Sequence, residues 1–264
     1  MDLGLKNKTA VVSGSTAGIG FAIAAALAAE GANVIINGRT EERVRSAIEK
    51  LRAQSLPGNV RGIAGDLGTA AGAAAFVQQA PDADVLINNL GIFEPKPFAE
   101  IPDADWLRFF EVNVLSGVRL ARAYLPGMRK KNWGRIVFIS SESAQNTPAE
   151  MIHYGMTKTA QISVARGLAE TVAGTGITVN SVMPGPTASE GVGAFVEHMA
   201  KQQSTTTAEI EKEFFEKVRP SSLLRRFETP EEIAAVVAFV ASAQAAAING
   251  AAVRAEGGVV RGIF

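Results

Sequence analysis

Tyr154 and Lys158 are the side chains whose types and spacing best suit acid–base chemistry. Residues four positions apart share one face of a helix, so the pair predicts a phenol beside an ammonium. A tyrosine titrates at about pH 10 and is a poor acid or base at neutral pH, but a nearby cation lowers its pKa. The spacing therefore predicts general acid–base work by Tyr154, although such pairs are common by chance and their surroundings must decide.

Ser141 lies thirteen positions before Tyr154, at the carboxyl end of the apolar run Arg135–Ser140. Parallel sheets carry their chemistry at the carboxyl ends of strands, so this hydroxyl is expected to hold a substrate oxygen beside the tyrosine. Ser140 is adjacent, and the choice between the two serines depends on the register of the strand end. His153 is expected to begin the helix with its ring in solvent, and the alternative is a ring that faces the substrate pocket.

A glycine-rich loop follows the first apolar run, Thr9–Ser13. Glycine at such a turn permits positive φ and close approach of the backbone to a pyrophosphate, and the helix that follows directs its free N–H groups at the anion. Three residues, rather than one, separate the first two glycines, and an ordinary turn is the alternative. The residues predicted to contact a dinucleotide here are Gly14, Ser15, Thr16, Gly18, Ile19 and Gly20.

The residues after the second apolar run bear on the choice of dinucleotide. NAD-binding sheets place an Asp or Glu there to accept hydrogen bonds from the ribose. This chain has Arg39, and no carboxylate precedes Glu41. A guanidinium can pair with a 2′-phosphate through its planar fork, so NADP(H) is favoured over NAD(H). The alternative for Arg39 is a solvated residue near a helix start.

The elements that must position these residues alternate along the chain. Short β-branched runs alternate with alanine-rich or amphipathic stretches, which predicts a parallel sheet with right-handed crossovers. We therefore expect an α/β chain, 1–264, forming a single domain around a Rossmann-like doubly wound parallel sheet of about seven strands. The expected strands are Thr9–Ser13, Asn33–Ile36, Val60–Ala64, Val85–Ile87, Arg135–Ile139, Ile177–Val182 and Ala251–Arg254, and the expected helices are Ile19–Glu30, Glu41–Ala53, Asp103–Met128, Tyr154–Ala173 and Pro230–Ser242.

The stretch around 186–228 interrupts this alternation with polar, charged sequence. It follows the sixth strand, and an insertion there is well placed to close over a substrate. A solvated surface hairpin is the alternative. Its apolar side chains suggest an apolar pocket lining, or else merely pack the insertion itself: Phe195, Met199, Phe214 and Phe215.

Composition excludes several classes of function. Lys and Arg match Asp and Glu at 26 each, so no excess charge draws the surface to nucleic acid or anionic lipid. The chain has no cysteine and two histidines, which argues against thiol catalysis, disulfides and a metal site. No segment approaches the roughly 18 to 20 apolar residues of a membrane span, and no secretory signal is recognisable, so a cytoplasmic location is expected.

Taken together, these motifs resemble the short-chain dehydrogenase/reductase family, in its short one-domain branch that includes 3-oxoacyl reductases. The likeness rests on the glycine loop, Asn88-Asn89-Leu90-Gly91, Asn113, Ser141, the Tyr154–Lys158 pair and Pro184-Gly185, and it covers nearly the whole chain. It departs in two places, because Ser13 stands where threonine is usual and Leu90 replaces a small alanine.

The resemblance implies hydride transfer between a nicotinamide dinucleotide and a carbonyl or alcohol. Tyr154 would be the general acid/base and Ser141 would orient the carbonyl. Lys158 would lower the tyrosine pKa and hold the nicotinamide ribose. Asn113 would hold a water in a proton relay, and its alternative is a helix residue whose polar groups are satisfied locally. Further cofactor contacts would be Asp66 and Leu67 at the adenine, Asn89 and Gly91 beside its ribose, and Thr187 at the carboxamide after Pro184-Gly185, each of which could instead be a cap or turn residue.

The same resemblance implies a homotetramer or homodimer built on the helices within Asp103–Met128 and Tyr154–Ala173. Three alternatives stay open for the activity: an NAD(H)-dependent dehydrogenase of the same family, a non-catalytic dinucleotide-sensing protein, and an epimerase or dehydratase of the same fold. No motif names the substrate. A ketone, a 3-oxoacyl group, a steroid-like ring and a polyol are all compatible, with the polyol least suited to an apolar lining.

Overall fold

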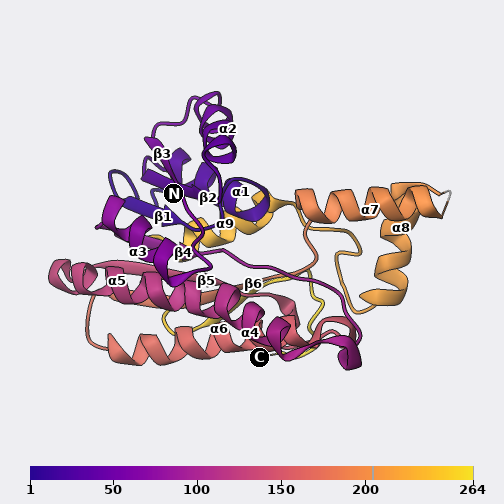
Figure 1. Ribbon diagram of the computed structural model, residues 1–264. Helices are drawn as coiled ribbons and strands as arrows, with labels where there is room; N and C mark the ends of the chain where they lie inside the picture. The colour runs from indigo at the N-terminus through magenta and orange to yellow at the C-terminus, as the bar shows by residue number, and fades with distance from the viewer. Residues whose placement is uncertain (204, 264) are drawn as a thin grey trace.

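The computed structural model describes residues 1–203 and 205–263, without the side chains of residues 194, 195 and 198. Within these residues seven strands pair in parallel in a single sheet of order β3-β2-β1-β4-β5-β6-β7 (Figure 1). The expected doubly wound sheet is confirmed. The strands are β1 (Thr9–Val12), β2 (Asn33–Gly38), β3 (Val60–Ala64), β4 (Val85–Asn88), β5 (Gly134–Ile139), β6 (Ile177–Pro184) and β7 (Ala252–Ala255).

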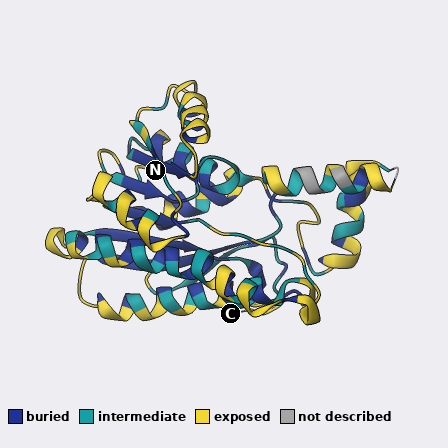
Figure 2. Ribbon diagram, viewed as in Figure 1, coloured by how far each residue is buried: buried dark blue, intermediate teal, exposed yellow. Residues whose placement is uncertain are grey.

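The apolar runs form central strands because both faces of the sheet are covered. Successive side chains of a strand point to opposite faces, so Ala10 and Val12 join one core cluster while Val11 joins the other. Strands β4 and β5 alternate in the same way. Figure 2 shows the result, with buried strands between helices whose outer faces are exposed.

Helices cover both faces of the sheet (Figure 1). On one face lie α1 (Gly18–Ala29), α2 (Glu41–Arg52) and α9 (Pro230–Val240), and the alanine-rich α1 packs closely on α9. On the other lie α3 (Ala70–Gln79), α5 (Ser116–Lys131) and α6 (Ile152–Thr171).

The expected helix Asp103–Met128 is interrupted. Its first part is α4 (Asp103–Phe110), followed by a π-helical turn, η2 (Glu111–Leu115), and then α5, which runs on to Lys131. Single π turns inside α-helices are frequent at functional sites, and this one contains Asn113. Short 3₁₀ turns lie at η1 (Phe98–Glu100), η3 (Glu142–Ala144) and η4 (Ala149–Met151).

The 186–228 segment leaves the sheet after β6 and returns before α9. It contains α7 (Glu190–Gln202), α8 (Thr207–Glu213) and a second π turn, η5 (Phe214–Val218), and Figure 1 shows α7 and α8 extending from the body of the protein. An isolated bridge between Thr187 and Glu228 joins the two ends of the segment. The segment is therefore anchored at its base, beside the carboxyl ends of the strands.

Candidate active site

The glycine loop joins β1 to α1 at the point where the strand order reverses, because β1 lies between β2 and β4. Gly14 and Gly18 have φ of +59° and +55°, which side chains disfavour. A Cβ on Gly20 would lie 2.4 Å from Asn89 Nδ2 and 2.5 Å from the Gly14 carbonyl oxygen. The helix begins after Ala17, whose side chain makes no capping bond. Free N–H groups and close backbone approach fit a pyrophosphate.

The loop is braced by Ser15, whose hydroxyl donates to the Val12 carbonyl at 2.6 Å and accepts from Asn37 N at 2.9 Å. Ser15 is fully buried, so its side chain supports the loop and does not face a ligand. Only its backbone could make the cofactor contact that was predicted for this residue. Thr16 lies over Gly38, where a Cβ would come within 2.4 Å of its methyl carbon.

Ser13 links this loop to the neighbouring one after β4. Its hydroxyl accepts from Asn89 N and Leu90 N, both at 3.0 Å, and Asn89 Nδ2 donates to the Ser13 and Gly14 carbonyls at 3.1 and 2.8 Å. Serine thus supplies the hydroxyl that the usual threonine would. Leu90 packs against the core cluster that contains Val11.

The predicted adenine-side residues differ in what they expose. Arg39 is exposed at the end of β2, and within the described residues none of the ion pairs involves it. Asp66 is also exposed, and its Oδ1 accepts from Gly68 N at 3.0 Å. Leu67 is 1% exposed in the core, so only its backbone could meet a ligand.

A cavity of about 850 Å³ lies at the carboxyl edge of the sheet, against the 186–228 segment. Helix α6 presents Tyr154 and Lys158 to it, and the chain after β5 presents Ser141. Nine of the predicted site residues line this cavity: Ile19, Asn89, Gly91, Ser141, Tyr154, Lys158, Pro184, Gly185 and Thr187.

The two adjacent serines have different surroundings. The Ser140 hydroxyl is buried and donates to the Lys158 carbonyl at 2.8 Å, which ties β5 to α6. Ser141 Oγ accepts from Ser143 N at 3.1 Å, and its hydrogen bond with Tyr154 acts to lower the pKa of that phenol. The geometry favours Ser141 as the hydroxyl that meets a substrate oxygen.

Asn113 lies directly beneath this cluster, fully buried in the π turn. Its side chain accepts from Ile92 N at 2.7 Å and donates to Thr157 Oγ1 at 3.0 Å, while its carbonyl accepts from Gln161 Nε2 at 2.6 Å. A Cβ on Gly91 would lie 3.4 Å from Lys158 Nζ and 3.5 Å from Asn113 Oδ1. These three residues therefore meet, as their predicted roles require.

The expected lowering of the Tyr154 pKa by Lys158 is not seen. Burial raises the pKa of Tyr154 to about 12, Ser141 opposes this rise, and the Glu142 carboxylate adds to it. Lys158 is itself 4% exposed, and burial lowers its pKa to about 8. Its ammonium donates to the Ile139 carbonyl at 2.9 Å and lies 5.5 Å from the Tyr154 ring centre. Burial, which disfavours the charged form of each group, is the largest cause of both pKa shifts.

The expectation that the His153 ring lies in solvent is wrong. The ring is fully buried, 4.0 Å from the Phe109 ring centre and 5.9 Å from that of Trp106. Among the described residues neither ring nitrogen has a hydrogen-bond partner, and burial lowers the pKa of the imidazole. The aromatic residues of α4 are what bury it.

On the opposite wall, the loop after β6 is held by Glu228. Its Oε2 accepts from Gly185 N at 3.0 Å, and burial raises its pKa to about 7. Thr187 Oγ1 donates to the Gly185 carbonyl at 2.9 Å. A Cβ on Gly185 would lie 2.8 Å from the Glu256 carbonyl oxygen, so the backbone here is tightly packed.

The cavity also contains an ion pair that sequence reasoning missed. Glu142 follows Ser141, Arg219 comes from the 186–228 segment, and the two are 3% and 7% exposed. Arg219 Nε donates to Glu142 Oε1 at 2.9 Å. Burial raises the pKa of Glu142, and the guanidinium opposes the rise. No local pattern links residues 77 positions apart.

The apolar lining is partly as expected. Phe214 lines the cavity, whereas Phe215 is 2% exposed and packs behind it against Phe227. Among the described residues, Met199 is not part of the cavity lining. The side chain of Phe195 lies outside the described part of the structure.

The described residues contain neither a candidate metal cluster nor a candidate membrane-spanning helix. No group of three or more His, Asp or Glu side chains is arranged to hold a metal ion. None of the helices in residues 1–203 and 205–263 has the length and apolar character to span a membrane.

Comparison with known proteins agrees with this geometry. A family model described as short chain dehydrogenase matches residues 8–200. The chain is 50% identical to the uncharacterized oxidoreductase YvaG of Bacillus subtilis over the full length of both. It is 32% identical to a D-beta-hydroxybutyrate dehydrogenase of Cupriavidus necator, covering 97% of this chain and 99% of that one. The structure of an L-sorbose reductase from Gluconobacter frateurii, complexed with NADPH and L-sorbose, is similar with a TM-score of 0.94 and 30% identity over all of both chains.

Proposed function

The chain belongs to the short-chain dehydrogenase/reductase family and is an NAD(P)-dependent oxidoreductase, and we propose that it interconverts a carbonyl group and an alcohol on a small molecule with NADP(H). The observation that carries this proposal is that Ser141, Tyr154 and Lys158 line one cavity together with the loops after β4 and β6. The glycine loop adjoins that cavity and fits a pyrophosphate.

In the direction of reduction, Tyr154 gives its phenolic proton to the substrate oxygen as the carbonyl π electrons move onto it. The nicotinamide, when bound, supplies the hydride to the carbonyl carbon. Ser141 donates a hydrogen bond to the same oxygen and so stabilises the developing alkoxide. With a pKa of about 12, Tyr154 holds its proton at neutral pH and is ready to act as the acid.

Lys158 supports the phenolate that the reaction leaves on Tyr154. Its ammonium lies on the same helix face, 5.5 Å from the phenol ring centre. Asn113 fixes the π turn beneath it through the backbone of Ile92 and the hydroxyl of Thr157. We propose that Asn113, through these hydrogen bonds, positions the π turn beside Lys158, where a proton relay from the lysine would begin.

The preference for NADP(H) is supported by Arg39. The group at the end of β2 that would meet the adenosine ribose is not a carboxylate. Asn37 there is buried and donates to the Ile63 and Gly65 carbonyls at 3.2 and 3.0 Å. Arg39 is exposed beside it and can pair with a 2′-phosphate. The L-sorbose reductase structure contains NADPH, which also supports this choice.

A thermal-shift titration with NADPH, NADP⁺, NADH and NAD⁺ tests the proposal, because a ligand that binds the native state raises its stability. We expect a larger shift with the phosphorylated pair, and we expect Arg39→Ala to remove that difference while leaving the NADH shift unchanged. Arg45→Ala, on the exposed face of α2, is the matched control. A larger NADH shift would favour an NAD(H)-dependent dehydrogenase.

Turnover separates an enzyme from a dinucleotide sensor. Loss of NADPH absorbance with a panel of ketones, aldehydes and oxoacids should be seen with the wild type and not with Tyr154→Phe. A thermal shift with no turnover of any carbonyl would instead support the sensing protein.

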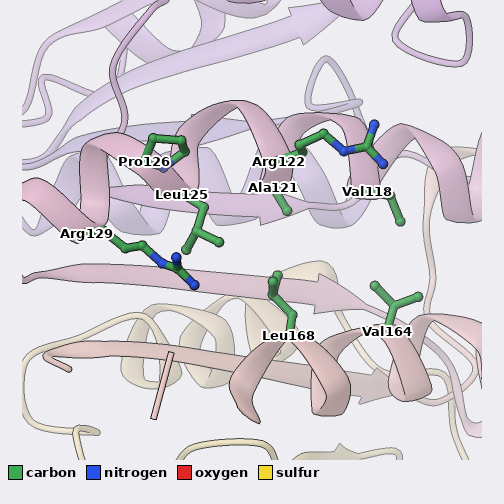
Figure 3. A pocket seen from close by; sticks show the side chains of 8 residues that line it. All are labelled: Val118, Ala121, Arg122, Leu125, Pro126, Arg129, Val164 and Leu168. Atoms are coloured by element: carbon green, nitrogen blue, oxygen red, sulfur yellow. The ribbon is translucent and has the colours of Figure 1, made fainter. Parts of the chain in front are cut away.

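We also propose that the chain assembles as a homodimer or homotetramer through α5 and α6. A hollow of about 350 Å³ lies between these helices, and Leu125 and Leu168 point into it (Figure 3). Its lining is mostly apolar, which suits a face covered by a second copy. Light scattering should give a multiple of the monomer mass, and Leu125→Glu should reduce it; a monomer at micromolar concentration would refute the assembly.

The cytoplasmic location stays a prediction that cell fractionation can test.

A further inference from the structure

Phe93 is an exposed aromatic residue beside Tyr154. It belongs to the loop after β4 and lines the cavity, and its ring centre lies 6.3 Å from that of Tyr154 in an edge-to-face arrangement. The residue is 55% exposed, although aromatic rings are among the side chains that gain most from burial. Phe93 therefore presents apolar surface that a molecule bound in the cavity can cover.

The order of residues along α6 places Phe93 at the substrate end of the cavity. Lys158 is near Gly91, where a Cβ would lie 3.4 Å from the ammonium, and this is the end assigned to the nicotinamide ribose. Tyr154 comes one turn earlier on the same helix face, and Met151, which also lines the cavity, immediately precedes the helix. With the reacting carbonyl at Tyr154, the rest of the substrate extends toward Phe93 and Met151.

The 186–228 segment provides a second apolar wall. Helix α7 contributes Val192 and Val196 to the cavity lining, and the π turn η5 contributes Phe214 and Val218. Val218 is 44% exposed, so this wall also has apolar surface in contact with water. Ligand sites typically combine an apolar lining with a few polar groups that orient the ligand. In this cavity the orienting groups are the serine and tyrosine hydroxyls assigned to the carbonyl oxygen.

The charged side chains of the cavity lining are already paired. Glu142 accepts from Arg219 Nε at 2.9 Å, and Lys217 donates to Glu213 at 2.6 Å. Glu150 lies 3.8 Å from Arg219 Nη1. Apart from the lysine on α6, which is assigned to the cofactor, each charged residue of the described lining thus has a partner of opposite charge. A substrate ion would compete with one of these partners, whereas an uncharged group would not.

We propose that the substrate is an uncharged ketone or aldehyde with an extended alkyl or aryl substituent, and that Phe93 selects it by packing against that substituent. This inference rests on the proposed function, because Ser141 and Tyr154 must hold the carbonyl oxygen. Covering the apolar surface of Phe93 and Val218 favours binding of such a substituent. A ketose would instead place hydroxyl groups against apolar walls that offer them few partners. The polyol stays the least suited of the compatible substrates.

The first test gives the wild-type enzyme methyl ketones that differ only far from the carbonyl, so that their intrinsic reactivity is closely similar. Each buried methylene should raise kcat/KM about three- to fourfold, and 2-octanone should exceed 2-butanone at least about thirtyfold. 7-Hydroxy-2-heptanone and 7-oxooctanoate replace the terminal methyl of 2-octanone by a hydroxyl and by a carboxylate. Both should be reduced at least about fivefold less efficiently than 2-octanone, because a polar end loses water without gaining a partner.

The second test is Phe93→Ala, at a position exposed enough for the variant to fold. The ratio of kcat/KM for 2-octanone to that for 2-butanone should fall about fivefold, as expected for losing contact with about half of a phenylalanine side chain, while 2-butanone changes less than about twofold. Phe93→Leu should restore most of the ratio, and both variants should keep the thermal shift with NADPH. Phe98→Ala is the control, because Phe98 is 65% exposed but is not part of the described cavity lining.

The outcomes separate this inference from the function on which it rests. Equal use of 2-butanone and 2-octanone by the wild type, or a preference for the hydroxyl or carboxylate ketone, would overturn the substrate class while leaving the oxidoreductase intact. An unchanged ratio in Phe93→Ala would overturn the role of Phe93, and loss of its NADPH shift would assign that ring to the cofactor instead. Turnover of no carbonyl at all would refute the proposed function itself, and this inference with it.

Discussion

Replacing Lys158 by methionine should make the protein more stable and catalytically inactive. Lys158 is 4% exposed, its ammonium has a single hydrogen bond, to the Ile139 carbonyl, and no ion pair of the described residues includes it. Burial lowers its pKa from 10.5 to about 8. At about 1.4 kcal/mol for each unit of pKa, the charged lysine costs the folded state about 3 kcal/mol at pH 7.

Methionine fills a similar volume without a charge. It forfeits the bond to Ile139, worth about 1 kcal/mol, so Lys158→Met should raise the free energy of unfolding by about 2 kcal/mol at pH 7. The direction in which the stability of the wild type changes with pH follows from proton linkage. Between pH 8 and 10.5 the unfolded state binds the proton that the folded state has released, so the wild type gains stability as pH rises. By pH 9.5 the advantage of the variant should shrink by about 2 kcal/mol.

Urea denaturation of both proteins at pH 7 and pH 9.5, at one protein concentration, measures the two effects. Lys50→Met, at an exposed position on α2, controls for the change of residue type and should match the wild type within about 0.5 kcal/mol at both pH values. The reasoning fails if Lys158→Met is no more stable than the wild type at pH 7, or if the difference between them does not change with pH.

Ser141→Ala should lower kcat/KM for carbonyl reduction by about 10²- to 10³-fold, the loss expected for one donor to a developing oxyanion. Ser140→Ala should keep most activity and lose about 1 kcal/mol of stability, since its hydroxyl donates only to the Lys158 carbonyl; equal activity losses would reverse the assignment. Reductive kcat/KM should be level below about pH 8 and fall above it as Lys158 loses its proton, and a profile flat to pH 10 would exclude a role for the ammonium. His153→Phe should stabilise the protein by about 1 kcal/mol at pH 7, because two unpaired buried nitrogens disappear. Burial lowers the His153 pKa below 6.5, so only the histidine protein should lose additional stability as pH falls through that value, as melting curves at pH 7 and pH 5 would reveal.

The sheet could be predicted because its signal is local. Each strand is a short apolar run, and its ends fall within two residues of the expected ones. Helix α3, Ala70–Gln79, was not expected, since its alanines and glycine give no alternation of polar and apolar residues. Only its tertiary packing, through Ala73 and Phe76, fixes it.

The site could be predicted where a motif determines a local position. The glycine loop and Ser141 follow the ends of strands, and Tyr154 and Lys158 share one face of helix α6. Burial and pairing could not be predicted, because they depend on residues distant in sequence. His153 is enclosed by α4, and Glu142 meets a residue 77 positions away. The pKa of Lys158 follows from the same burial, and the spacing of Tyr154 and Lys158 contains no information about it.

The π turn at Glu111–Leu115 has a consequence for insertions and deletions. An α-helix rotates by about 100° per residue, so removing one residue from this turn would restore regular hydrogen bonding and rotate α4 relative to α5 by about that angle. Phe109, which packs on His153, and Asn113, which meets Ile92 and Thr157, could then no longer both keep their contacts. A shortened helix here would look better formed by local criteria and would lose its active site. Sequence designs that favour helical regularity would select this error, whereas natural variation should preserve the length of the helix more strictly than its composition.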